Sequence, residues 1–150
     1  MSVIRITKHF NFEAAHALYG YDGKCKNIHG HSYKLSVCVL GKPIDDKSNV
    51  KNGMVMDFGD LKKIVNQEIV KVYDHATVLN RQSPHLALAE TLKNNAHKIV
   101  LVDYQPTSEN MLLDFAERLQ KVLPKNIKLH SLKLYETANS FAEWFAADNK

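Results

Sequence analysis

Hydrophobic and polar residues alternate along the first sixteen positions of the chain. Alternation with a period of two is typical of a β-strand that buries one face. A second alternating run extends from about His29 to Leu40, and a polar, glycine-containing loop from Tyr19 to Ile28 separates the two runs. This order predicts two long antiparallel strands joined by a long loop. Their apolar faces carry Ile4, Ile6, Phe10, Phe12 and Ala14 in the first strand and Tyr33, Leu35, Val37 and Val39 in the second.

Two later segments have the apolar spacing of amphipathic helices. The first follows Asp57, a residue type favoured at helix N-caps, and has Asp60 in its first turn. The second begins at Thr107-Ser108-Glu109, which combines a hydroxyl cap with an acidic first turn, and Pro124 closes it. The apolar faces are Leu61, Ile64, Val65, Ile69 and Val72 in the first helix and Met111, Leu112, Phe115, Leu119 and Val122 in the second.

Shorter elements complete the pattern. Residues 84–97 have weak helical spacing, residues 98–104 indicate a short strand, and residues 129–137 and 140–146 are expected to form the last two strands. Paired strands separated by helices predict an α+β domain with an antiparallel sheet. We expect residues 1–150 to form a single domain, because they contain no linker, low-complexity tract or repeat of solenoid length.

Composition narrows the class of protein. Hydrophobic residues make up 45% of the 150 positions and charged residues 24%, which excludes a disordered chain, a collagen-like fibre and a polytopic membrane protein. The net charge of +4 comes from scattered lysines, which favours a solvated surface over nucleic-acid binding. The first residues contain no apolar signal segment, so we expect a cytoplasmic protein without a membrane partner. The two cysteines are expected to stay free.

Three histidines are the sharpest chemical signal. His29 and His31 flank Gly30 on one strand, so both imidazoles point to the same, apolar face. His16 ends the first strand on its apolar face, so pairing of the two strands brings all three rings together. Three neutral imidazoles with one open position are a usual way to hold catalytic zinc. The alternative is three ordinary core histidines, but matched positions on two strands favour a metal.

Cys25 stands four residues before His29 and has two interpretations. A thiolate near a metal and the lysines at 24 and 26 has a lowered pKa and can serve as a base. Alternatively, Cys25 is the fourth ligand of a closed, structural zinc site, which would make the protein a non-catalytic domain. The spacing does not separate these two readings.

Carboxylates and a further histidine complete the candidate residues. Asp74-His75 follows the first helix in a loop, where a histidine tuned by a carboxylate can act as a general acid or base. Glu136 shares a strand face with apolar residues, so its charge needs a partner such as a planar ligand with two parallel N–H donors, or backbone groups. Glu109 can line a pocket, although stabilisation of the helix start explains it more simply.

The combined motifs resemble the 6-pyruvoyltetrahydropterin synthase and 6-carboxytetrahydropterin synthase family. The resemblance covers about residues 5 to 145. The chain departs from it in three ways: the segment from about 81 to 104 is longer than in the shorter relatives, Tyr73 stands where Leu is common, and Ala17 stands where Arg is common. The matching motifs, in order, are Phe12-Glu13-Ala14-Ala15-His16, Cys25, His29-Gly30-His31, Met54-Val55-Met56-Asp57-Phe58, Asp74-His75, Leu79-Asn80, Pro106-Thr107-Ser108-Glu109-Asn110 and Glu136-Thr137.

The resemblance implies the tunnelling fold, in which an antiparallel sheet carries helices on one face and subunits join their sheets into a barrel with pterin sites between them. We expect a homohexamer built as a dimer of trimers. The implied roles are zinc ligation by His16, His29 and His31, proton abstraction by Cys25, a second acid/base unit of Asp74 and His75, pterin anchoring by Glu136, and a pocket wall of Thr107, Ser108 and Glu109.

The implied substrate is 7,8-dihydroneopterin triphosphate. One family branch eliminates triphosphate and stops at the 6-pyruvoyl product. The other also releases acetaldehyde and yields 6-carboxy-5,6,7,8-tetrahydropterin on the way to queuosine and other 7-deazapurines. Asp57-Phe58-Gly59 and the run from Glu136 to Ser140 are more similar to the second branch. A third branch replaces the cysteine with Glu, which Cys25 argues against. We therefore expect a zinc-dependent lyase of the 6-carboxy branch, with the 6-pyruvoyl enzyme as the alternative.

Overall fold

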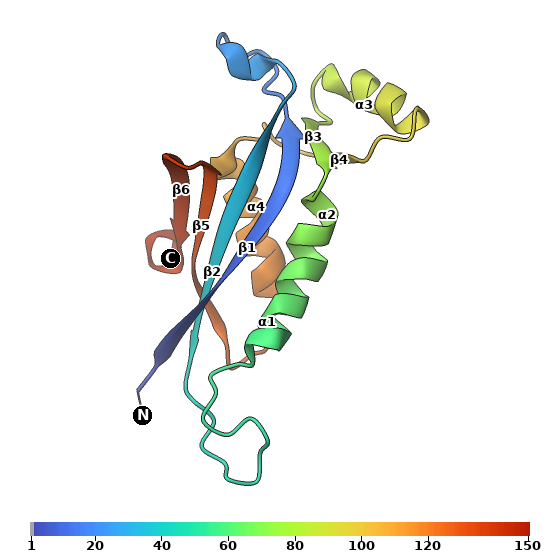
Figure 1. The fold of residues 1–150 in the computed structure, drawn as a ribbon. Coiled ribbons are helices and arrows are strands. Elements are labelled where there is room, and N and C mark those ends of the chain that lie inside the picture. Colours follow the sequence, from blue (N-terminus) through green and yellow to red (C-terminus); the bar gives the residue numbers. More distant parts are fainter. Residues whose placement is uncertain (1) are drawn as a thin grey trace.

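The computed structural model describes residues 2–150, which form a six-stranded sheet with helices packed against one face (Figure 1). Two long strands, β1 and β2, run across the molecule with α4 behind them in this view. The sheet order is β4-β3-β1-β2-β5-β6. The strands are β1 (Ile4–His16), β2 (His29–Gly41), β3 (Ala76–Asn80), β4 (Ile99–Val102), β5 (Lys128–Thr137) and β6 (Ser140–Phe145).

The predicted antiparallel sheet is confirmed for β1, β2, β5 and β6. The sheet as a whole is mixed, because β3 pairs with β1 in parallel and β4 pairs with β3 in parallel. The pattern of the sequence predicted β4 but not β3. In the β1–β2 ladder, His16 lies opposite His29 and Ala14 opposite His31, which fixes the relative positions of the three predicted ligands.

The helices begin where the sequence predicted. Asp57 caps α1 (Phe58–Val65) by accepting a hydrogen bond from the Gly59 N–H at 2.7 Å, and Thr107 caps α4 (Ser108–Val122) through the Asn110 N–H at 3.2 Å. A π-helical turn, η2 (Asn66–Val70), continues α1 into the short α2 (Lys71–Tyr73), so the first predicted helix is one run with a π segment inside it. The weakly predicted helix is α3 (His85–Asn94).

The main core lies between the inner face of the sheet and the helices α1 and α4. Its largest buried side chains include Phe12 and Tyr33, whose rings stack with centroids 5.1 Å apart, and Phe115 of α4, which meets Phe12 edge-on. This packing holds the histidine-bearing ends of β1 and β2 against the start of α4. Among the described residues, no helix has the length and apolar character needed to cross a membrane.

A long connection joins β1 to β2 beyond the end of the sheet. It contains the short 3-10 helix η1 (Lys24–Lys26), which carries Cys25. Figure 1 shows this connection and α3 at the same end of the molecule. A second 3-10 helix, η3 (Ala146–Asn149), follows β6. The chemical residues predicted from the sequence thus gather near one end of a rigid sheet.

Candidate metal centre

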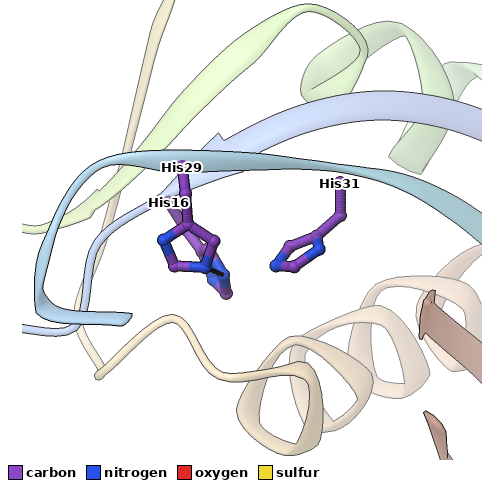
Figure 2. Close-up of side chains that lie close together, drawn as sticks. All are labelled: His16, His29 and His31. Carbon is purple, nitrogen blue, oxygen red and sulfur yellow. Dashed lines mark hydrogen bonds between the residues drawn. The ribbon is translucent and has the colours of Figure 1, made fainter. Parts of the chain in front are cut away.

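Three imidazoles converge on the helix-covered face of the β1–β2 hairpin (Figure 2). One nitrogen each of His16, His29 and His31 lies within 4.8 Å of the other two. His16 is buried, whereas His29 and His31 are half-buried, so the cluster opens on one side. This is the arrangement that the alternation of the two strands predicted.

The ring hydrogens of two of these histidines are fixed by the backbone. His16 Nδ1 lies 2.6 Å from the carbonyl oxygen of Pro106, and His29 Nδ1 lies 2.7 Å from that of Asn27. A carbonyl only accepts hydrogen bonds, so each Nδ1 must carry the ring hydrogen. In the neutral rings both Nε2 atoms then hold lone pairs, yet they face each other at 3.0 Å. A shared cation resolves this repulsion, and carbonyl contacts to the other ring nitrogen are usual for metal ligands.

The protonation states also suit a metal. Burial lowers the pKa of His16 and outweighs the Pro106 carbonyl, which raises it. Burial likewise lowers the pKa of His31, although the charge of Glu136 acts in the opposite direction. His31 Nε2 is buried without a hydrogen-bond partner: Glu136 Oε1 is 3.4 Å away, within ion-pair range but outside hydrogen-bond geometry. Neutral imidazoles with free lone pairs are the form that binds metals, so the residues fit a cation such as zinc.

Glu136 stands beside the histidines at the end of β5. Its neighbours two and four positions back, Leu134 and Leu132, are buried in the core, as the alternation predicted. The partners of the carboxylate are Ser108, whose hydroxyl donates to Oε2 at 2.6 Å, and the His31 ring on the Oε1 side. Glu136 remains 29% exposed, so its carboxylate can still meet a ligand.

The three predicted pocket-wall residues take different positions at the start of α4. Ser108 is buried and contacts Glu136, which places it in the site. Thr107 is half-buried, and its hydroxyl caps the helix. Glu109 is exposed in the first turn of the helix, the position in which a carboxylate stabilises the helix dipole.

Cys25 is a half-buried free thiol in η1. The carbonyl of Cys25 accepts a hydrogen bond from the Leu18 N–H at 2.9 Å, which closes the connection into a compact loop. The Cys25 sulfur is not part of the group of ligand atoms formed by the three histidines. The group that could hold a metal ion therefore consists of the three histidines alone.

Tyr33 packs beside the histidine cluster, a neighbour that the sequence pattern did not identify. It lies two residues after His31 on the same face of β2 and is 1% exposed. Its ring meets His31 and His16 edge-on, with centroids 5.6 Å and 6.3 Å apart. Burial raises the pKa of its phenol, and the charges of Glu136 and Cys25 raise it further. The alternation identified Tyr33 only as a core residue, because an aromatic ring on an apolar face has the same signature.

Asp74 and His75 lie at the edge of β1. Asp74 Oδ1 accepts a hydrogen bond from the Glu13 N–H at 2.9 Å, and His75 Nε2 is 3.8 Å from the same oxygen. The His75 side chain is 78% exposed and its backbone has a positive φ of 61°. It borders a shallow pocket of about 320 Å³ that Glu13 and Ser32 also line. Within residues 2–150, no hydrogen bond or ion pair joins this pair to the histidine cluster.

Comparisons with known proteins show which family and fold this chain resembles. The sequence profile of the family described as 6-pyruvoyl tetrahydropterin synthase matches residues 5–147. A 6-carboxy-5,6,7,8-tetrahydropterin synthase of Haemophilus influenzae is 36% identical over 143 residues, covering 95% of this chain and 99% of that protein. A 6-pyruvoyl tetrahydrobiopterin synthase of Homo sapiens is 33% identical, covering 91% of this chain and 87% of that protein. A solved structure of an uncharacterized Wolinella succinogenes protein has a TM-score of 0.78 at 20% identity, covers 97% of this chain and 99% of that one, and shows a shared fold.

Proposed function

Because the chain belongs to the 6-pyruvoyl tetrahydropterin synthase family, we propose that it is a zinc-dependent 6-carboxy-5,6,7,8-tetrahydropterin synthase. Its substrate would be 7,8-dihydroneopterin triphosphate, and its other products acetaldehyde and triphosphate. The observation that carries the proposal is the cluster of three histidines beside the partly exposed carboxylate of Glu136. The similarity to the Haemophilus relative, which bears the 6-carboxy name, supports the choice of branch.

His16, His29 and His31 would hold the zinc, with the ring orientations of His16 and His29 already set by backbone carbonyls. When bound, the ion would polarise hydroxyl groups of the substrate side chain and make neighbouring protons easier to remove. Three protein ligands leave room for these hydroxyls, as a catalytic site requires. The buried lone pair of His31 Nε2 is the clearest sign that a ligand belongs there.

Glu136 would anchor the pterin ring. A carboxylate that accepts two parallel N–H bonds matches the amino group and the adjacent ring N–H of a pterin, as it would match an Arg guanidinium. The Ser108 hydroxyl holds one carboxylate oxygen and so orients the group before the ligand arrives. Thr107 and Glu109 contribute through the start of α4, which carries Ser108 at its first position.

Cys25 would remove protons from the substrate side chain, and Asp74 with His75 would form the second acid/base unit. Within one chain the Asp74-His75 pair makes no hydrogen bond or ion pair with the histidine cluster. The proposal therefore includes a site shared between copies of the chain, in which this exposed pair reaches the centre of a neighbour.

The alternative of the same class is a 6-pyruvoyltetrahydropterin synthase, which would eliminate triphosphate only. The 33% identity to the human relative supports this alternative. The sequences Asp57-Phe58-Gly59 and Glu136 to Ser140 favour the 6-carboxy branch instead. The non-catalytic alternative with a closed zinc site is less compatible with the structure, because Cys25 lies outside the ligand group.

Product analysis tests the proposed reaction. Purified protein is incubated with 7,8-dihydroneopterin triphosphate, and the pterins, acetaldehyde and triphosphate are quantified by liquid chromatography and mass spectrometry. We expect 6-carboxytetrahydropterin and acetaldehyde in equal amounts and one zinc per chain by elemental analysis. A 6-pyruvoyl product without acetaldehyde would establish the alternative branch, and absence of any turnover by zinc-loaded protein would refute the enzymatic proposal.

The role of Cys25 is tested on the same preparation. Cys25→Ala should keep zinc and melting temperature but lose at least about 100-fold in turnover, because proton transfer by a positioned side chain contributes about 10²–10⁴-fold. Cys38→Ala is the matched control, since Cys38 is a buried residue of mid β2 and its replacement should preserve turnover. Loss of zinc in Cys25→Ala would instead identify a structural fourth ligand.

A further inference from the structure

A tight turn between α2 and β3 carries the proposed second acid/base unit. α2 ends at Tyr73, Asp74 follows in an extended conformation, and His75 has a positive φ of 61° before β3 begins. A left-handed backbone is unfavourable for a residue with a β-carbon and persists only where its surroundings hold it. Because this backbone conformation also sets the direction of the His75 side chain, the contacts that hold the turn decide where the imidazole points.

The turn interrupts the helical hydrogen bonds at one carbonyl. The Asp74 N–H still donates to the carbonyl of Val70, four positions back, at 2.8 Å, as in a regular helix. The next N–H, that of His75, donates instead to the carbonyl of Glu13 on β1. The carbonyl of Lys71 therefore lacks the partner that a continuing helix would give it.

A lysine from a later segment supplies the missing donor. Lys98 Nζ lies 2.8 Å from the carbonyl oxygen of Lys71 and 2.7 Å from that of Asp74. An ammonium group has three N–H donors and is favoured at the C-terminal end of a helix, so it can satisfy both carbonyls. The peptide group between Asp74 and His75 is thus held from two sides, its N–H by Glu13 and its carbonyl by Lys98.

The backbone of Lys98 is itself anchored to the sheet. Its carbonyl accepts a hydrogen bond from the Thr77 N–H at 3.0 Å, and Ile99, the first residue of β4, pairs with Thr77. Within residues 2–150, no ion pair joins the Lys98 ammonium to a carboxylate. Lys98 therefore holds the backbone of the turn and not the carboxylate of Asp74. It belongs to the segment from about 81 to 104, whose role the sequence did not indicate.

We propose that Lys98 is a positioning residue, whose ammonium fixes the peptide between Asp74 and His75 and thereby directs the His75 imidazole for proton transfer. The inference rests on the proposed function of this pair as the second acid/base unit. Proton transfer needs the reacting groups near hydrogen-bond distance, so an imidazole that samples other directions is less often productive. The Asp74 carboxylate is held separately, by the Glu13 N–H at 2.9 Å, so Lys98 acts mainly on the imidazole.

Lys98→Met is the direct test, because it removes the three donors and keeps most of the length of the side chain. We expect kcat to fall roughly 10-fold, less than the 10²–10⁴-fold that a general acid or base itself contributes, since the imidazole is still present. KM should change by less than about 2-fold, because no contact with the substrate is lost. Zinc content should be unchanged. Lys98→Arg should restore most of kcat, because a guanidinium can also donate to two carbonyls.

Arg81→Met is the matched control. Arg81 lies in the same segment, donates to the carbonyl of Leu101 at 2.9 Å and pairs with Asp103 at 3.1 Å, away from the turn. We expect wild-type kcat in this variant. An equal loss of kcat in Arg81→Met and Lys98→Met would show that both side chains only stabilise the segment and would overturn the inference. A raised KM with unchanged kcat in Lys98→Met would show direct substrate binding by the lysine and would overturn it too.

A second readout separates this inference from the proposed function. Amide hydrogen exchange of the turn is measured by mass spectrometry on a peptide that covers residues 74–77 of the zinc-loaded proteins. We expect exchange to be roughly 10-fold faster in Lys98→Met and unchanged in Lys98→Arg and Arg81→Met, because only the first variant frees the turn. If the wild type does not turn over the triphosphate, faster exchange still supports the restraint by Lys98 although the proposed reaction fails. Unchanged exchange, or faster exchange with wild-type kcat, overturns the positioning role while leaving the reaction intact.

Discussion

Asp114 of α4 shows how a single side chain can tie together separate segments. Its Oδ2 accepts hydrogen bonds from Tyr73 at 3.0 Å and Tyr104 at 2.6 Å, while Oδ1 accepts from Arg118 Nε at 2.8 Å. Burial by itself raises the pKa of this carboxyl, but the three donors outweigh it and hold the pKa below the usual range. The cluster links α2, α4 and the segment after β4.

At the residue scale we predict that Asp114→Ala destabilises the fold by about 2–4 kcal/mol, because it leaves two phenols and a guanidinium without their acceptor. The charged carboxylate stabilises the fold when the pH is above the pKa that Asp114 has in the unfolded chain. This stabilisation is lost as the pH falls through the lower pKa that Asp114 has in the folded protein. The difference in unfolding free energy between wild type and variant should therefore be large at pH 7 and shrink below about pH 4.

Urea unfolding of wild type and variant at pH 7 and below about pH 4 measures this difference. Glu117→Ala is the control, because Glu117 pairs with Lys121 on the exposed side of the same helix. Exposed pairs of this kind contribute only about 0.3–0.5 kcal/mol. The role given to the carboxylate would be contradicted if Asp114→Ala lowered the free energy of unfolding no more than the control does. It would also be contradicted if the decrease persisted at low pH.

Single residues also mark how far the site could be predicted from the sequence. That His16, His29 and His31 share one face was predictable, because a register slip of one residue would expose the apolar face of a strand; their exact pairing is fixed by the observed register. It was also predictable that Glu136 needs a hydrogen-bond partner. The identity of that partner was not predictable, since Ser108 lies 28 positions away in the sequence. The lack of a hydrogen-bond partner for the buried Tyr33 hydroxyl within the described residues has no signal in the pattern, because it depends on packing around the ring.

At the element scale, α3 braces the connection that carries Cys25. The Tyr19 ring meets His85 edge-on with centroids 5.2 Å apart, and Gln105 Nε2 donates to the Tyr19 carbonyl at 3.1 Å. Ala17 packs in a small second core with Leu79 of β3 and Ala89 of α3. The segment between residues 81 and 104, whose role the sequence did not indicate, thus contacts the base of this loop through His85 and Ala89.

We predict that His85→Ala loosens the loop without affecting the histidine cluster. Alkylation of Cys25 by iodoacetamide, in a Cys38→Ala background, should become about 3-fold to 10-fold faster, because local opening exposes the thiol more often. Turnover should fall by a similar factor, as the base is positioned less well. Leu88→Ala is the control, since Leu88 lies exposed on the same helix. Equal alkylation rates in all three proteins would show that α3 does not restrain the loop.

The elements differ in how well the sequence predicted them, for physical reasons. β1 and β2 were predictable because each has one buried and one exposed face, which produces alternation. β3 was missed because its five residues include three buried positions without alternation, and its parallel partners lie far away in the sequence. The helix caps were predictable, whereas the π segment has no local signature.

At the scale of the whole molecule, three strand edges remain unpaired within the described residues, one of them the outer side of the short β4. The two others are longer: β3 covers β1 only from Ala14 to His16, so the edge from Ile4 to Phe12 is open, and β6 has no neighbour on its outer side. Unpaired edges are templates for pairing with another chain. Exposed apolar side chains lie close to both edges, with Ile4 47% exposed on β1 and Phe141 48% exposed on β6. Pairing of β6 of one copy with β1 of the next would remove both edges and close a ring.

These edges predict an oligomer, and the family resemblance implies a homohexamer built as a dimer of trimers, which light scattering after size-exclusion chromatography can detect. In it, Cys25 and the Asp74-His75 pair of one site would come from different chains. Inactive Cys25→Ala chains are refolded together with inactive His75→Ala chains in equal amounts. With random mixing, about one quarter of the sites receive both intact residues, so about one quarter of wild-type turnover should return.

The control is each variant, Cys25→Ala or His75→Ala, refolded by itself. Both must stay inactive for the turnover of the mixture to be attributed to shared sites. The physical basis is the position of the pair: Asp74 is fixed to the β1 backbone at the open edge, and His75 extends from that edge into solvent. Groups held there are free to meet the histidine cluster of another copy that approaches along this edge. A monomer in solution, or mixed oligomers without recovered turnover, would contradict the shared site, because the pair and the cluster of one chain would then have to act within that chain.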